Sequence, residues 1–192
     1  MDVKEALEKR RAYRALGAFE VTDGVIKELA GAARLMPSCF NNQPWKFVFA
    51  RSPEKLEALR ASFSQNNDWA RKAPLVIAAF ARKEYDCVIK EREYYLFDLG
   101  MGVGALLLRA AELGLVAHPI AGFDPAAAKK ALGIPDGDMI IALVIVGKKT
   151  EDLSALTPKQ AEGEKARPPR LAPENVFAVD AYSEKLAARP QH

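Results

Sequence analysis

The sequence predicts a single domain that combines helices with strands. A length of 192 residues suits one folding unit. Amphipathic segments, whose apolar residues recur three and four positions apart, alternate with short, continuously apolar segments. The first pattern is typical of helices and the second of buried strands. A hydrophobic content of 49% and a charged content of 28% are ordinary for a water-soluble globular chain.

Three helices and two strands are expected in the first 81 residues. Thr22 can cap a helix at its N-terminus, and Pro37 can end that helix. Residues 75–81 are apolar throughout, as in a central strand with both faces buried. In order, we expect a helix over 2–14, a helix from Thr22 to Pro37, a strand over 45–50, a helix over 52–62, a polar loop over 65–72 and a strand over 75–81.

The longest helix is expected over 91–113, where Tyr95, Leu99, Leu106 and Ala110 follow helical spacing. Asp124 is suited to cap the helix that comes next. The remaining elements of this part are a loop over 118–123, a short helix from Asp124 to about 132 and a buried strand over 139–146 closed by Gly147.

The composition changes after Lys148. Residues 149–173 are charged and rich in proline, so they cannot form a core of their own. Residues 176–179 are then expected to form a late strand, followed by a helix-like tail. We therefore expect 1–192 to be one domain whose segment 149–192 is an extended arm that crosses to a partner subunit. The alternative is a strand that returns to its own sheet.

Charge and cysteine content exclude several classes of protein. A net charge of +3 is mild for a nucleic-acid-binding protein. Cys39 and Cys87 form no metal-binding pattern, so no metal is expected, and both are expected to be reduced thiols in a cytoplasmic protein. The longest apolar run, 99–108, is too short to span a bilayer, so no membrane association is expected.

Arginines near the N-terminus are candidates for binding an anion. Arg10 and Arg14 would share one face of the predicted first helix, with Arg11 to the side. Guanidinium groups match the geometry of phosphate oxygens. The alternative is a solvated basic end of a helix, which suits the helix dipole.

Residues 37–47, Pro-Ser-Cys-Phe-Asn-Asn-Gln-Pro-Trp-Lys-Phe, are too polar for a core and too aromatic for an ordinary loop. The amides of Asn41, Asn42 and Gln43 carry both donors and acceptors, which can read the edge of a heteroatom-rich ring. Trp45 could cover a ring face. Together with the arginines, the segment points to a flavin nucleotide, although the amides could also stabilise a turn.

Three further features have weaker functional interpretations. Residues 100–104, Gly-Met-Gly-Val-Gly, continue a helical stripe and lack the preceding strand of a dinucleotide-binding loop. Their glycines instead suggest close approach of another element, such as a helix of a second subunit. His118 could be a general acid, but a structural or exposed role is favoured. Gly122 could expose backbone N–H groups to a ligand or form an ordinary turn.

The order of these segments resembles that of the nitroreductase-like family of FMN-dependent NAD(P)H oxidoreductases, over nearly the whole chain. Residues 10–14, Arg-Arg-Ala-Tyr-Arg, are similar to the family's Arg-Arg-Ser-x-Arg, with Ala12 in place of serine. Residues 37–45 resemble Pro-Ser-x-x-Asn-x-Gln-Pro-Trp, and residues 119–123 resemble Pro-Ile-x-Gly-Phe. Arg170 is similar to a late basic residue. Ala121 stands where several members have an acidic residue.

The resemblance implies an α+β fold with a mainly antiparallel central sheet flanked by helices, and an intertwined homodimer with FMN at the subunit interface. The arginines would hold the phosphate and ribityl chain, the 37–39 segment would come from the partner subunit, and Asn66 would read the pyrimidine edge. The cofactor-binding residues are expected to be Arg10, Arg11, Ala12, Arg14, Pro37, Ser38, Cys39, Asn41, Gln43, Asn66, Ile120, Ala121, Gly122 and Arg170.

The function that this implies is ping-pong transfer of hydride from NAD(P)H, through the flavin, to a nitroaromatic, a quinone or an activated alkene. The flavin would carry the chemistry, so no catalytic side chain is expected. One alternative is an FMN-binding carrier, sensor or flavin-fragmenting enzyme without NAD(P)H turnover. Another is a non-enzymatic module that binds polyanions through its basic arm.

Overall fold

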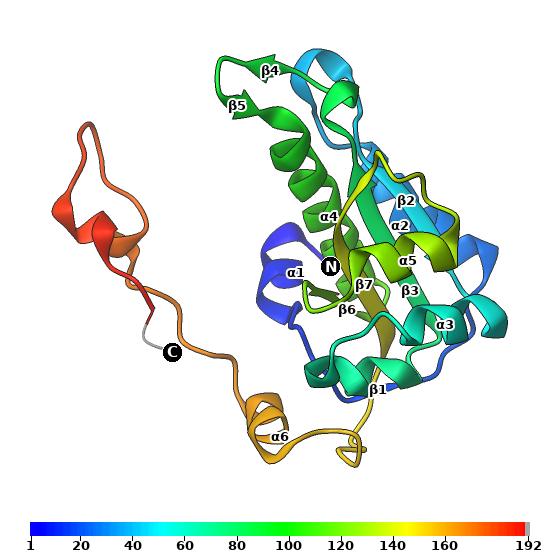
Figure 1. Cartoon of the computed structure of the whole chain (residues 1–192). Coiled ribbons are helices and arrows are strands. Elements are labelled where there is room, and N and C mark those ends of the chain that lie inside the picture. Colours follow the sequence, from blue (N-terminus) through cyan, green and yellow to red (C-terminus); the bar gives the residue numbers. More distant parts are fainter. Residues whose placement is uncertain (191–192) are drawn as a thin grey trace.

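A five-stranded antiparallel sheet forms the centre of the molecule, whose computed structural model describes residues 1–190 (Figure 1). The strand order is β1–β7–β3–β2, and β6 also pairs with β7. The strands are β1 (Leu16–Gly17), β2 (Lys46–Ala50), β3 (Leu75–Ala81), β6 (Val116–Ile120) and β7 (Met139–Lys149). Every pairing in the sheet is antiparallel, which confirms the predicted α+β class.

Helices cover both faces of the sheet, which explains why β3 is apolar at every position. Successive side chains of a strand point to opposite faces. Leu75 and Ile77 pack with residues of α2 (Asp23–Arg34) and α4 (Tyr94–Glu112). Val76 and Ala78 belong to the opposite core cluster, with residues of α3 (Pro53–Arg60) and α5 (Pro125–Leu132).

Side-chain caps define where three helices begin, as predicted. The Thr22 hydroxyl accepts a hydrogen bond from the N–H of the third following residue, and Ser52 does the same at the start of α3. Asp124 accepts from two N–H groups of α5. Caps of this kind each stabilise a helix by about 1 kcal/mol.

Several predicted boundaries are wrong because contacts from distant segments override local patterns. The first helix, α1 (Val3–Lys9), stops before residues 10–14. The first part of the predicted loop over 118–123 belongs to β6, and the predicted polar loop over 65–72 is a 3-10 helix, Gln65–Lys72, whose Trp69 is buried. The long helix starts only at Tyr94, after a small hairpin of β4 (Val88–Ile89) and β5 (Arg92–Glu93).

The C-terminal segment leaves the body of the molecule after β7. It forms α6 (Pro158–Lys165) beside the sheet and then runs outward to two 3-10 turns, Pro173–Asn175 and Glu184–Ala187 (Figure 1). The predicted strand over 176–179 is wrong, because this segment finds no strand to pair with in its own protomer. Val176, Phe177 and Val179 are each more than half exposed.

The prediction of two free thiols is also wrong. Cys39 and Cys87 form a disulfide that joins residues 48 positions apart in the sequence. The carboxylate of Asp86 lies beside the two sulfur atoms. Metals bind the thiolate form of cysteine, and sulfur atoms joined in a disulfide are not thiolates. Disulfides are rare in reducing compartments, so this bond does not support the predicted cytoplasmic location, which stays a prediction. No helix within residues 1–190 has the length and apolar character needed to cross a bilayer.

Candidate functional site

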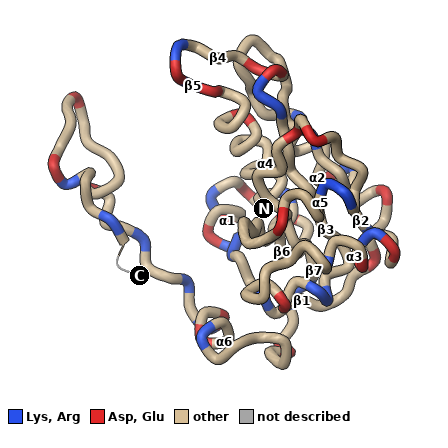
Figure 2. The backbone as a smooth tube through the Cα atoms, viewed as in Figure 1, with Lys and Arg blue, Asp and Glu red and all other residues tan. Residues whose placement is uncertain are grey.

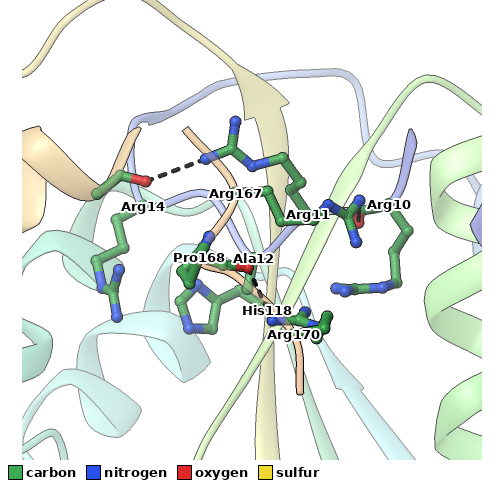
Figure 3. Close-up of a pocket in the computed structure, with 9 residues that line it drawn as sticks. Arg10, Arg11, Ala12, Arg14, His118, Arg167, Pro168 and Arg170 are labelled. Carbon is green, nitrogen blue, oxygen red and sulfur yellow. Dashed lines mark hydrogen bonds between the residues drawn. The ribbon is translucent and has the colours of Figure 1, made fainter. Parts of the chain in front are cut away.

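Five arginines surround one cavity of about 220 Å³, which we call the arginine pocket (Figure 3). They come from the segment after α1 and from the start of the C-terminal arm, and the imidazole of His118 on β6 lies among them. Figure 2 shows that basic residues continue from α6 into the arm. The lining residues are Arg10, Arg11, Ala12, Arg14, His118, Gly163, Arg167, Pro168 and Arg170.

Hydrogen bonds between the two ends of the chain build this pocket. The carboxylate of Glu164 accepts from the N–H groups of Arg14 and Ala15 at 2.9 and 3.4 Å. The Arg11 guanidinium donates to the carbonyl groups of two residues around α6, at 3.1 and 2.7 Å. Arg167 donates to the carbonyl oxygen of Arg10 at 2.7 Å. These contacts fix 10–14 outside any helix, so the prediction that Arg10 and Arg14 share a helical face is wrong.

The pocket is strongly electropositive. Five arginines outside the pocket pair with carboxylates, for example Arg82 with Asp138 at 3.2 Å and Arg51 with Asp23 at 2.7 Å. Among residues 1–190, no carboxylate lies within 4.0 Å of the guanidinium nitrogens of the five pocket arginines. Burial and then repulsion from Arg167 and Arg170 lower the pKa of Arg10. A bound anion would relieve this repulsion.

His118 is buried beside the arginines and is neutral at pH 7. The imidazole ring lies beside the indole ring of Trp69, and the two ring centroids are 4.7 Å apart. The imidazole Nδ1 lies 3.0 Å from the carbonyl oxygen of Tyr13. Burial lowers the pKa of His118 to about 4; the bond to Tyr13 opposes this shift, and the charges of Arg14 and Arg10 add to it. The favoured structural role of His118 therefore fits better than that of a general acid.

The end of β6 lies against the 3-10 helix that contains Asn66. The carbonyl oxygen of Gly122 accepts from the N–H of Ser64 at 3.0 Å and from the side chain of Asn67 at 2.9 Å. The Gln160 side chain of α6 donates to the carbonyl oxygen of Asn66 at 2.9 Å. The structure thus brings Asn66 and the 120–122 segment to the same side of the molecule as α6 and the arginine pocket.

Five of the predicted residues, in the 37–43 segment, lie at the opposite end of the protomer, beside the β4–β5 hairpin (Figure 1). The Cys39 N–H donates to the buried carboxylate of Asp98 on α4 at 2.7 Å, and the disulfide joins Cys39 to Cys87. Trp45 is 6% exposed in a core cluster, so its ring cannot cover a ligand. A single protomer therefore does not unite the predicted site. The separated residues are Pro37, Ser38, Cys39, Asn41 and Gln43.

Sequence reasoning missed two groups that shape the pocket. Arg167 belongs to the basic run 167–170 but was not assigned to the site; its spacing of three from Arg170 was the available signal. Glu164, which holds the backbone of Arg14, gave no signal, because its partner lies 150 residues away.

Comparisons with known proteins identify the class. A model of the nitroreductase family matches residues 7–68 and 64–148, so the chain belongs to the nitroreductase family. An NADH dehydrogenase of Thermus thermophilus is 32% identical over 184 residues, which cover 79% of this chain and 89% of that protein. The family resemblance inferred from the sequence is thereby confirmed.

Solved structures agree with this assignment. An oxidoreductase containing FMN superposes with a TM-score of 0.81 at 26% identity, covering 95% of this chain and 94% of the other. A nitroreductase family protein from Clostridium difficile 630 has the same fold, with a TM-score of 0.75 at 20% identity, covering 95% of this chain and 100% of the other.

Proposed function

We propose that this protein is an FMN-dependent NAD(P)H oxidoreductase that works as a homodimer. The observation that carries the proposal is the arginine pocket, in which five guanidinium groups converge without a carboxylate partner among residues 1–190. A pocket with this charge, in a nitroreductase-family fold, suits the phosphate of FMN. The relatives named NADH dehydrogenase and oxidoreductase containing FMN support this choice.

The donors of the pocket fit a phosphate ester. Arg10 and Arg14 have no hydrogen-bond acceptor among the side chains of residues 1–190, so their guanidinium groups are available to phosphate oxygens. Arg170 adds a third cation from the arm. Ala12, unlike serine, offers no hydroxyl there. When bound, FMN would accept hydride from NAD(P)H and pass the electrons to a nitroaromatic, a quinone or an activated alkene in ping-pong order.

The flavin ring would complete its site at a subunit interface. From the pocket, the ring would extend toward Asn66 and the segment Ile120, Ala121 and Gly122. The 37–43 segment lies at the far end of the same protomer, so a partner subunit would have to supply it.

Exposed apolar surface supports this dimer. Phe97 on α4 is 63% exposed, and at Gly100 and Gly104 on the same helix a Cβ would meet no neighbouring group within 4 Å. An arm with exposed Val176 and Phe177 could also cover the partner. Burial of these apolar side chains against a second copy would stabilise the pair.

A spectroscopic experiment tests the proposal. The protein purified with added FMN should show bound flavin, and NADH or NADPH should bleach it under argon. Bleaching followed by reoxidation with a quinone or a nitroaromatic supports the oxidoreductase. Bound FMN that neither nucleotide reduces would instead indicate a flavin-binding protein without NAD(P)H turnover. Absence of FMN binding at micromolar concentrations would refute the proposal.

Arginine variants test the pocket directly. Arg10→Ala and Arg14→Ala should each weaken FMN binding about 10- to 100-fold, because hydrogen bonds between charged groups contribute about 1.5–3 kcal/mol. The affinity for riboflavin, which lacks the phosphate, should change much less in these variants. Arg60→Ala is the matched control, since Arg60 pairs with Glu57 outside the pocket. Equal losses for riboflavin and FMN would contradict the assigned role, as would a loss in the control.

A further inference from the structure

His118 offers a hydrogen-bond acceptor in a pocket of donors. Its Nδ1 lies 3.0 Å from the carbonyl oxygen of Tyr13, and a carbonyl oxygen can only accept, so Nδ1 carries the proton. In a neutral imidazole the other nitrogen, Nε2, then has a free lone pair. Burial and the neighbouring Arg14 and Arg10 keep the ring neutral by holding its pKa at about 4.

In the described part of the chain, the Nε2 atom is unpartnered and not fully enclosed. Within residues 1–190 it has no hydrogen-bond partner, and it is not among the fully enclosed side-chain atoms that lack one, which are Trp69 Nε1 and Asp86 Oδ2. His118 itself lines the pocket (Figure 3). Its ring is held by Trp69 on one side and by the bond to Tyr13, so the lone pair has a defined direction.

The other lining side chains that the structure describes are guanidinium donors or carry no polar group. The dianion of a simple alkyl phosphate, its main form above pH 7, can satisfy the arginines but carries no O–H to donate to a neutral acceptor. A phosphate ester with a hydroxyl near the phosphate can do both. Its anionic oxygens accept from Arg10 and Arg14, and its O–H donates to Nε2.

We propose that His118 is a positioning residue that selects phosphorylated polyols by accepting a hydrogen bond, at Nε2, from a hydroxyl group close to the phosphate. This inference rests on the proposed function, in which the ribityl phosphate of FMN is such a polyol. It adds a specificity that the arginines alone cannot supply, because they recognise any anion of suitable size.

Two ligands of equal charge and chain length isolate the hydroxyl contact. Ribitol 5-phosphate carries hydroxyls along its chain, whereas pentyl phosphate carries none. Calorimetric titration of the full chain at pH 8, where both ligands are dianions, gives the ratio of their dissociation constants, and pentyl phosphate measures the anion contacts alone. A neutral hydrogen bond is expected to favour ribitol 5-phosphate by about fivefold through His118.

Two variants separate this role from a structural one. His118→Asn places an amide donor where Nδ1 meets Tyr13 but removes the Nε2 acceptor. His118→Gln can place a carbonyl oxygen near the Nε2 position but gives up the bond to Tyr13. We expect His118→Asn to reduce the ligand ratio about fivefold while leaving the affinity for pentyl phosphate unchanged, and His118→Gln to retain most of the ratio. An unchanged ratio in His118→Asn would overturn the proposal.

Nitrogen-15 NMR of the wild-type protein tests the same point without any substitution. The Nε2 resonance should be that of an unprotonated nitrogen, and it should shift on addition of ribitol 5-phosphate but not of pentyl phosphate. A proton on Nε2 in the free protein, or equal shifts with both ligands, would contradict the inference.

The inference and the proposed function fail in different ways. If FMN is never reduced by NAD(P)H but the ligand ratio depends on His118, the function fails and the inference stands. If FMN is bound and reduced normally while His118→Asn keeps the wild-type ratio, the function stands and the inference fails.

Discussion

Acidification should destabilise this protein through His118, at pH values where most carboxylates are still ionised. The folded pKa of about 4 lies below the ordinary value of 6.5. Between these two values the unfolded chain binds a proton that the folded protein excludes. The free energy of unfolding therefore falls as the pH drops through 6.5, and this decrease levels off near pH 4.

The size of the effect follows from the two pKa values. The difference between the unfolded and folded pKa values corresponds to about 3 kcal/mol of unfolding free energy. About 2 kcal/mol of this is lost between pH 8 and pH 5. His118 is only 8% exposed, so solvent screening reduces this value little. A loss of this size is a large fraction of the stability of an ordinary domain.

Urea denaturation at pH 8, 7, 6 and 5, followed by circular dichroism in phosphate-free buffer, measures this loss. His118→Asn is the reference, because it does not titrate and its amide can still donate to Tyr13. The stability advantage of the wild type over this variant should fall by about 2 kcal/mol from pH 8 to pH 5. Saturating phosphate should shrink the fall, since it neutralises Arg10 and Arg14. A constant difference between the two proteins would refute the reasoning.

Three further predictions concern packing, covalent structure and assembly. Gly122→Ala should cost about 1–3 kcal/mol in unfolding free energy, because its Cβ would lie 2.6 and 2.7 Å from two polar side-chain atoms of the neighbouring 3-10 segment. Gly31→Ala, with nothing within 4 Å, should stabilise α2 by about 0.5–1 kcal/mol in the same urea assay; equal effects of the two changes would contradict this account. Cys39→Ser with Cys87→Ser should lower stability by up to about 4 kcal/mol, since the bond closes a loop of 48 residues, whereas free thiols in the native mass spectrum would show that no such bond exists. Phe97→Glu should convert a dimer to a monomer in sedimentation velocity, because Phe97 is 63% exposed on α4, and an unaltered dimer would place the interface elsewhere.

Elements with a strong local signal were predicted well. Residues of β3 are apolar at every position because helices cover both faces of the sheet, and this burial leaves a direct mark on the sequence. The caps at Thr22 and Asp124 depend on backbone groups two or three residues away, so their pattern is also local.

Features that depend on distant partners were not predictable in this way. Residues 10–14 continue a helical pattern, yet they lie outside any helix, where Glu164 and Arg167 hold them through bonds that span 150 and 157 residues. The disulfide of Cys39 with Cys87 depends on a hairpin that brings residue 87 beside residue 39. Residues 176–179 have strand-forming side chains, but a strand needs a neighbouring strand to satisfy its backbone.

By itself, the sequence determined the family, the order of most helices and strands, and the presence of arginines suited to a phosphate. These features depend on residue types and on their spacing over short stretches of sequence. Only the tertiary structure decided that Arg167 joins Arg10, Arg14 and Arg170 at one cavity and that a neutral His118 lies among them. The reason is physical: charge convergence and burial depend on which distant segments pack together, and no local pattern records that packing.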